Sequence, residues 1–280
     1  MTLTAPPPAA AYDAFHRARA RTDLASRLYA QAMGGDYPAE AAASSSCDWP
    51  LLGLMTARLQ MQPGQLLADA GCGTGGIGLW LARPSALRLE GFDLSPVAVA
   101  QATARRTHFL GDAADRATFR VAELEDTGLP DSIADGIVCV DAFALATDRD
   151  AAVRELARIL APGGRLVMTR ALRRDAGPVW EEQAQAAGLM VQHVDERPAE
   201  PAMWERLYRL WIAHADELRR ELGDAQAQAM LHEAHRVLPT LPGRRAVLLT
   251  LERPSASRGR PIAADTMTGP SRRTDERTPQ

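Results

Sequence analysis

One short run of the sequence combines several glycines with an acid, a combination suited to binding a ligand. The run 69–76 reads DAGCGTGG and begins with Asp69. A glycine has no Cβ, so its backbone can approach a ligand closely and adopt angles that other residues avoid. Gly71, Gly73 and Gly76 also satisfy the GxGxxG pattern of dinucleotide-binding proteins, which is weak evidence by itself. The run therefore indicates a cofactor site without deciding which cofactor binds there.

Acidic residues and a turn farther along the chain narrow the choice of cofactor. Asp93 lies about 20 residues beyond the glycine run and ends an apolar segment, where an acid can bind both ribose hydroxyls of a cofactor. Glu123 opens the stretch ELED after the next such segment, and Asp141 follows another. The turn Pro-Gly-Gly at 162–164 precedes a further apolar segment. Asp93 is shared with nicotinamide enzymes, whereas Glu123 and the turn have no role in them.

This ordered set of features resembles class I S-adenosylmethionine (SAM)-dependent methyltransferases, in particular the ubiquinone/menaquinone-type branch and small-molecule methyltransferases of bacterial specialised metabolism. The resemblance covers about residues 65–170, and more loosely the chain to about residue 254. It implies S-adenosyl-L-methionine as the co-substrate, with no metal. It also implies a Rossmann-like α/β fold: a doubly wound, mostly parallel seven-stranded sheet with an antiparallel last strand and a helical lid.

The resemblance also implies roles for the residues of the cofactor site. The glycines would line the methionine part of SAM, Asp93 would bind the ribose, and Leu94 would pack on the adenine. Glu123, which is longer than the aspartate that the family often has there, would accept a hydrogen bond from the adenine amino group. Cys72 is expected to be a small residue of the loop rather than a nucleophile. The expected cofactor-binding residues are Asp69, Gly71, Cys72, Gly73, Gly75, Asp93, Leu94, Glu123, Leu124, Val140 and Asp141.

The residues that would take part in catalysis are less well marked. Methyl transfer from a sulfonium is an in-line displacement, so an enzyme mainly has to align the two reactants and exclude water. A hydroxyl acceptor benefits from a base within hydrogen-bond reach, whereas a stronger nucleophile needs none. The candidate bases are Asp141, His16, His193 and His214, and each histidine is also compatible with a structural role.

Aromatic residues at helical spacing are the candidates for binding a partly apolar acceptor. Trp204, Tyr208 and Trp211 recur on one face of a segment that follows the predicted sixth strand. The same stripe is equally typical of a helix that simply docks on the rest of the protein. Trp49 presents the same choice, and Phe143 follows the fourth strand, at the end that should face the cofactor.

Composition argues against several other classes of protein. The formal net charge is -3 and all 32 basic residues are arginine, so there is no lysine to act as a Schiff base and no basic surplus for nucleic acid. The three cysteines form no CxxC pair, which favours a reducing cytoplasm over a disulfide framework. The stretch HEAH at 232–235 lacks the spacing of a zinc-binding HExxH motif. We expect a cytoplasmic monomer or homodimer that acts on a small-molecule acceptor, without membrane or nucleic-acid partners.

The elements that must position these residues alternate along the chain. Apolar segments begin near residues 65, 87, 118, 136, 165, 189 and 245, and helical patterns lie between most of them, which predicts a parallel sheet covered on both faces. The predicted organisation is a disordered lead (1–10), an N-terminal helical cap (11–62), the SAM-binding core (63–200), a helical lid (201–240), the last core strand (241–253) and a disordered tail (254–280). One helix is expected over 202–222 and another over 224–238.

Two other functions fit parts of the pattern. A SAM-binding cyclase, or another enzyme that uses the same site without transferring methyl, would share every cofactor residue. A nicotinamide-dependent oxidoreductase would share the glycine run and Asp93, but not Glu123 or the Pro-Gly-Gly turn.

Overall fold

The computed structural model describes residues 9–177 and 179–255. Most of the predicted lead (1–10) and tail (254–280) lies outside the described residues. Residues 9 and 10 are an exception to the predicted lead, because they form the start of the first helix.

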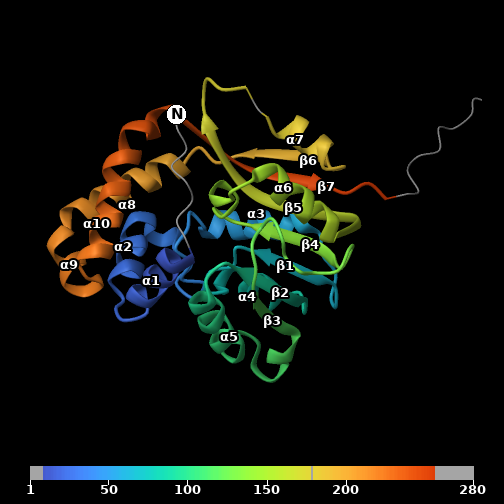
Figure 1. Ribbon diagram of the computed structural model, residues 1–280, viewed down its shortest axis with the longest axis horizontal. Helices are drawn as coiled ribbons and strands as arrows, with labels where there is room; N and C mark the ends of the chain where they lie inside the picture. Colours follow the sequence, from blue (N-terminus) through green and yellow to red (C-terminus); the bar gives the residue numbers. More distant parts are fainter. Residues whose placement is uncertain (1–8, 178, 256–280) are drawn as a thin grey trace, which may run out of the picture.

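Within the described residues, seven strands form one sheet with the order β3-β2-β1-β4-β5-β7-β6 (Figure 1). All neighbouring strands from β3 to β5 are parallel, and β7 is antiparallel to both β5 and β6. The predicted mostly parallel sheet with an antiparallel last strand is confirmed. The strands are β1 (Leu66–Ala70), β2 (Arg88–Asp93), β3 (Ala117–Val121), β4 (Ala134–Cys139), β5 (Leu160–Arg173), β6 (Met190–Glu196) and β7 (Arg244–Glu252).

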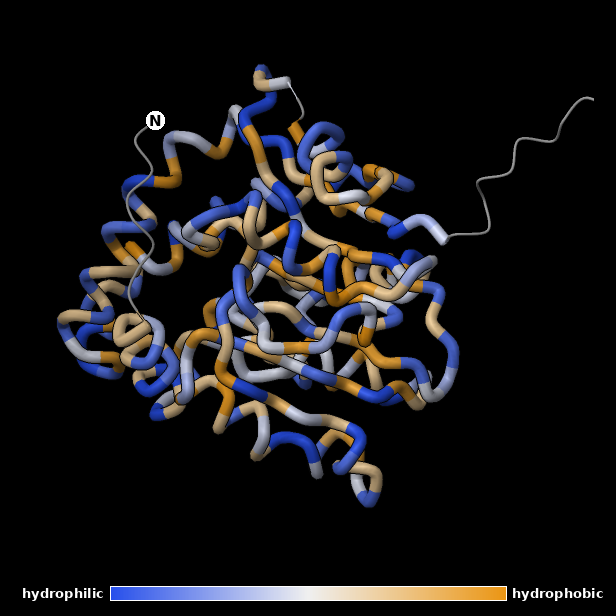
Figure 2. Tube along the Cα trace, turned by 45° about the vertical axis from the view of Figure 1, so that its right-hand side comes forward, coloured by the Kyte–Doolittle hydropathy of each residue, from blue (hydrophilic) through white to orange (hydrophobic). Residues whose placement is uncertain are grey.

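Two helical layers cover the sheet, and both faces of the central strands are apolar for that reason. All five residues of β1 are buried, as expected of a parallel strand between two layers. Hydrophobic residues are frequent in the interior of the molecule, and polar residues predominate on the outlying turns (Figure 2). One layer contains α3 (Trp49–Leu59), α4 (Gly76–Ala82) and α5 (Pro96–Leu110), and the other contains α6 (Arg149–Ile159) and α7 (Trp180–Ala186).

Helix starts follow the local sequence. Ser95 caps α5 by accepting a hydrogen bond from the Ala98 amide, and Pro96 occupies the first turn, where its missing N–H costs nothing. Asp48 caps α3 in the same way. Although α3 belongs to the predicted N-terminal cap, it packs on the sheet beneath β4 and β5.

The other long helices form a separate apolar cluster beside the carboxyl ends of the strands, seen together on the left of Figure 1. We call this assembly the helical cluster. It consists of α1 (Ala9–Arg19), α2 (Leu24–Met33), α8 (Glu200–Ala213), α9 (Ala215–Leu222) and α10 (Asp224–Val237). The single helix predicted over 202–222 is wrong in one respect, because the chain leaves helical geometry at His214 and divides it into α8 and α9.

Candidate cofactor and acceptor site

The glycine run lies where the order of the strands reverses, since the chain continues from β1 to β2 on one side and returns to β4 on the other. Ligands of open α/β sheets bind at this position. The carbonyl of Phe92 at the end of β2 accepts hydrogen bonds from the amides of Gly71 (2.9 Å) and Cys72 (3.0 Å). Gly71, Gly73 and Gly75 all have positive φ angles. The run is thus a tight loop held between β1 and β2.

Besides the positive φ, a close contact between two loops requires glycine at position 71. A Cβ built at this position would lie 2.3 Å from the Cβ of Ala142, which follows β4. Two carbon atoms that are not bonded to each other do not approach so closely. The loops after β1 and β4 can therefore lie together only if residue 71 has no side chain.

Asp69 is buried at the end of β1 and anchors the helix that follows the loop. Its Oδ2 accepts a hydrogen bond from the Gly78 amide at 3.0 Å, and the side chain is almost completely enclosed. Burial penalises the charged form and raises the pKa of Asp69 to about 7. Asp69 therefore positions α4, and its expected role in binding the cofactor stays a prediction.

Asp93 connects the glycine loop to the start of α5. Its Oδ2 accepts a hydrogen bond from the Gly73 amide (2.8 Å), and its Oδ1 accepts one from the Ser95 amide (2.9 Å). A carboxylate oxygen has two lone pairs, so each oxygen can accept a further hydrogen bond from a ribose hydroxyl. The side chain is only partly buried. This arrangement fits the ribose-binding role implied for Asp93.

Helix α1 lies against the same loop. The ring carbon Cε1 of His16 is 3.8 Å from the position that a Cβ of Gly73 would occupy. The Ser95 hydroxyl donates a hydrogen bond to the Asp13 carboxylate at 2.5 Å, which fastens α1 to the start of α5. Burial lowers the pKa of His16, and this effect outweighs the opposing influence of the Asp93 charge. His16 is therefore mainly neutral near pH 7 and can accept a proton.

Asp141 lies just beyond β4 and is fully engaged by other residues. Its carboxylate accepts hydrogen bonds from the amide (2.6 Å) and hydroxyl (3.1 Å) of Ser46, and from the hydroxyl of Thr169 (2.9 Å). Arg197 in turn donates to the hydroxyl and the carbonyl oxygen of Ser46. Asp141 also has a positive φ of 56°, which is uncommon for a residue other than glycine. These contacts favour a structural role for its carboxylate over that of a base.

Arg105 on α5 fastens the loop from the other side. Its Nη1 donates to the carbonyl oxygen and the hydroxyl of Thr74, both at 3.0 Å, and its Nη2 donates to the carbonyl oxygens of Glu40 and Ala41. The segment between α2 and α3 is therefore attached to the glycine loop. Sequence reasoning missed Arg105 and Ser46, because neither belongs to a motif and both come from distant parts of the chain.

The residues expected at the adenine are less constrained by the structure. The backbone after β3 is joined to β2, since the Ala122 amide donates to the Asp93 carbonyl oxygen at 3.1 Å. Glu123 is exposed, Leu94 is partly exposed, and Leu124 packs against the edge of the core. The side chain of Val140 is buried, so only its backbone can face a ligand. The roles assigned to these four residues stay predictions.

Two of the candidate histidines lie in unfavourable positions. His193 is on β6, which is four strands away from β1, so about 19 Å of sheet separates it from the loop. His214 lies between α8 and α9, and its Nδ1 is 2.8 Å from a carboxylate oxygen of Glu217. Of the three candidate histidines, the structure places only His16 beside the glycine loop. Asp141, the fourth candidate base, also lies next to this loop, but Ser46 and Thr169 engage its carboxylate.

The predicted aromatic stripe forms the centre of the helical cluster. Trp204 stacks on Tyr208 with ring centroids 5.4 Å apart, and Tyr208 contacts the edge of Trp211. Tyr29 of α2 packs against both tryptophans. Tyr208 and Trp211 are buried, which is the packing that the alternative interpretation predicts. Their role toward an acceptor stays a prediction.

Glu233 gives this cluster a polar centre that the sequence did not reveal. Its carboxylate accepts a hydrogen bond from the Tyr208 hydroxyl at 2.9 Å. Its charge helps to raise the pKa of Tyr12 on α1, after the larger effect of burial. The HEAH stretch is therefore not simply an outward polar face, because Glu233 faces the other helices.

The two remaining aromatic candidates lie outside the helical cluster. Phe143 is 1% exposed, belongs to the core beneath β4, and has the guanidinium of Arg170 4.7 Å from its ring centroid. Trp49 is 40% exposed and packs edge-on against Trp80 of α4. Neither position favours contact with an acceptor held by the helical cluster.

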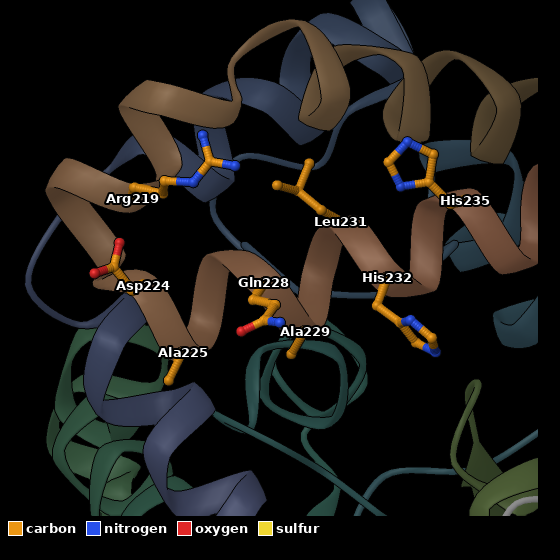
Figure 3. Close-up of a pocket in the computed structure, with 8 residues that line it drawn as sticks. All are labelled: Arg219, Asp224, Ala225, Gln228, Ala229, Leu231, His232 and His235. Atoms are coloured by element: carbon orange, nitrogen blue, oxygen red, sulfur yellow. The ribbon is translucent and has the colours of Figure 1, made fainter.

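Two surface hollows lie away from these residues. The larger, about 920 Å³, is open to solvent and lies over α9 and α10, and the other lies between α6 and α7. Figure 3 shows that His232 and His235 project from α10 to different sides. Across residues 9–177 and 179–255, no cluster of three metal-ligating side chains occurs. In the same residues, no helix has the length and apolarity needed to cross a bilayer.

Comparison with known proteins agrees with this geometry. Residues 68–168 match the family model of a methyltransferase domain. The chain is 30% identical to methyltransferase GfsG of Streptomyces halstedii, over 51% of this chain and 52% of that protein. It is 28% identical to the 27-O-demethylrifamycin SV methyltransferase of Amycolatopsis mediterranei, over 56% of this chain and 55% of that one. These alignments span about half the length of the curated relatives.

Similar solved structures share the fold over more of the chain. The crystal structure of the [4+2]-cyclase SpnF superposes with a TM-score of 0.67 at 23% identity, covering 90% of this chain and 98% of that one. A SAM-dependent methyltransferase from Geobacter sulfurreducens superposes with a TM-score of 0.56 at 21% identity, covering 81% and 98% of the two chains. The sheet order, the glycine loop with Asp93 beside it and the matched domain lead to one conclusion: residues 68–168 match the methyltransferase-domain family, on the fold that SAM-dependent methyltransferases share.

Proposed function

We propose that the protein transfers a methyl group from SAM to a carbon, nitrogen or oxygen atom of a small, partly apolar metabolite. The observation that carries this proposal is the attachment of Asp93 to the amides of Gly73 and Ser95 at the reversal of the strand order. It leaves lone pairs of the carboxylate next to a glycine loop that a bulky cofactor can approach. The curated relatives named above are methyltransferases of Streptomyces halstedii and Amycolatopsis mediterranei, and one of them acts on 27-O-demethylrifamycin SV by its name, which supports a role in bacterial specialised metabolism.

The residues of this chain fit the part that such a reaction requires of a protein. When bound, SAM supplies a methyl group activated by a sulfonium. Asp93 and the loop amides would hold the cofactor, and α1 would cover it and exclude water. If the acceptor is a hydroxyl, His16 would accept its proton, since the ring is mainly neutral and lies beside Gly73.

Calorimetric titration with SAM and S-adenosylhomocysteine (SAH) tests the first part of the proposal. We expect saturable binding of both, no comparable binding of NADH, and a loss of about tenfold or more in affinity for Asp93→Ala, because two hydrogen bonds to the ribose are removed. Asp112→Ala, at an exposed acid in the turn after α5, should bind normally. Unchanged SAH binding by Asp93→Ala would contradict the proposed site.

A second candidate is a cyclase that uses the same cofactor site without transferring methyl. It is favoured by the similarity to SpnF, which extends over the helical cluster as well as the sheet. Incubation with SAM carrying a labelled methyl group separates the two functions. Label in a product supports the methyltransferase, whereas conversion of a substrate with all label retained in SAM supports the cyclase.

A further inference from the structure

Arg19 of the helical cluster combines a buried guanidinium nitrogen with the lack of an ion-paired carboxylate among the described residues. It lies on α1 three residues after His16, and residues at this spacing share one face of a helix. Its guanidinium carbon is 4.0 Å from the ring centroid of Phe15 and 5.8 Å from that of Tyr29. The cation is therefore held between aromatic rings, on the same side of α1 as the histidine that touches the cofactor loop.

The hydrogen bonds of Arg19 leave part of its guanidinium unused. Nη1 donates to the Ser44 hydroxyl at 2.6 Å, and the guanidinium is also hydrogen-bonded to the Tyr29 side chain. Nε is buried and has no acceptor within the described residues. Within residues 9–177 and 179–255, no carboxylate lies within 4.0 Å of it as an ion-pair partner. Glu233, whose charge raises the pKa of Arg19, is itself hydrogen-bonded to Tyr208. A buried donor on a cation is costly unless something binds it.

The charges around Arg19 leave its guanidinium able to bind an anion. Burial lowers the pKa of Arg19, against the opposing effects of Tyr29, Glu233 and Tyr37. An arginine nevertheless stays protonated in proteins and offers a planar set of donors that matches a carboxylate. By contrast, Arg17 on the outward side of α1 pairs with Asp13 and is 57% exposed.

We infer that Arg19 binds the acceptor, and that the acceptor carries an anionic oxygen such as a carboxylate. This inference rests on the proposed function. Three residues of helix correspond to a rise of about 4.5 Å, so an anion at Arg19 would lie roughly one helical turn from His16 and Gly73. The group that receives the methyl should accordingly be close to the anionic group of the acceptor, and the aromatic rings around Arg19 would contact its apolar part.

Binding of a simple anion to the SAH-saturated protein tests this inference. The probes are benzoate and its uncharged analogue benzamide, and tryptophan fluorescence or calorimetry reports their binding. We expect benzoate to bind wild-type protein more tightly than benzamide, and Arg19→Gln to weaken benzoate by about tenfold or more while changing benzamide little, because charge-assisted hydrogen bonds are lost. Arg19→Lys should retain part of the preference, and Arg17→Gln should retain all of it.

Each other result would contradict the inference. If Arg19 only braces α1 against α2, Arg19→Gln lowers the melting temperature and weakens both probes equally. If wild-type protein binds SAH but does not distinguish benzoate from benzamide, the inference fails and the proposed function stands. Absence of SAH binding by the wild-type protein would instead overturn the proposed function.

Discussion

The carboxylate of Asp141 accepts hydrogen bonds from both the amide and the hydroxyl of Ser46, 95 residues earlier in the chain. This pair attaches the segment between α2 and α3 to the end of β4, directly beside the glycine loop. Because Asp141 has a positive φ, its peptide groups are turned away from the direction of the strand. The contact thus sets the conformation of the backbone that the family resemblance places at the methionine amine.

Substitution of Asp141 separates this structural role from that of a base. Asn tolerates positive φ and keeps one acceptor oxygen, whereas Ala keeps neither advantage. We expect Asp141→Ala to lower the free energy of unfolding by about 2–3 kcal/mol and to weaken SAH binding, with Asp141→Asn intermediate. Denaturant titration and calorimetry measure both effects. A base would behave differently: Asp141→Asn would keep its stability and SAH affinity and lose only turnover.

Gly71 offers a test of the close approach between two loops. Gly71→Ala should cost about 2–3 kcal/mol and weaken SAH binding, because it combines a strained φ with a clash against Ala142. Gly128 is a matched control, since it also has a positive φ but nothing lies near its missing Cβ. Gly128→Ala should cost only about 1 kcal/mol and leave SAH binding unchanged. Equal effects of the two changes on SAH binding would show that the approach of the loops is unimportant.

Asp69 should make stability depend on pH in a defined direction. Its folded-state pKa of about 7 exceeds its ordinary value, so the folded protein binds the extra proton and loses this stabilisation as pH rises through about 7. Asp69→Asn cannot lose a proton. The variant should therefore gain stability relative to wild type by about 2 kcal/mol between pH 5 and pH 8.5, measured by urea unfolding without SAM. Asp112→Asn, at an exposed acid, should show no such gain, and a constant difference for Asp69→Asn would contradict the prediction.

His16 should titrate below the ordinary value of a histidine. Burial disfavours its charged form, and the nearby Asp93 carboxylate partly offsets this effect. NMR titration of the histidine ring protons, with His16→Gln to assign the signal, should find its pKa below about 6.5. Asp93→Asn should lower that pKa further, because the favourable negative charge is gone. A His16 pKa that does not respond to this substitution would place Asp93 too far away to influence the ring.

The sequence predicted the elements of the core because each carries its own local signal. Strand β1 reads as an apolar run before glycines, and Ser95-Pro96 marks the start of α5. Asp93 and the glycine loop could be placed together because parallel strands end on the same edge of a sheet. The break at His214 carried no such signal, since no glycine or proline interrupts the helical pattern there.

Contacts between distant segments could not be predicted in this way. Ser46, Arg105 and Glu233 act through partners that only the folded chain brings near, and each looks like an ordinary surface residue in the sequence. Phe143 shows the converse case: its position after β4 suggested a ligand contact, whereas its ring is buried in the core, and the contact stays a prediction. His16 was one of several equivalent histidines until the packing of α1 on the loop distinguished it.

The insertion of β7 between β5 and β6 has a consequence for biosynthesis. Strand β7 pairs along both of its edges, yet among the strands of residues 9–177 and 179–255 it leaves the ribosome last. Until it arrives, β5 and β6 each present an open row of amide and carbonyl groups, while the helices of 200–237 have already been made. Open strand edges are templates for pairing with other chains. A chain that stops before Arg244 should therefore aggregate, so the integrity of its last strand decides whether the newly made protein stays monodisperse.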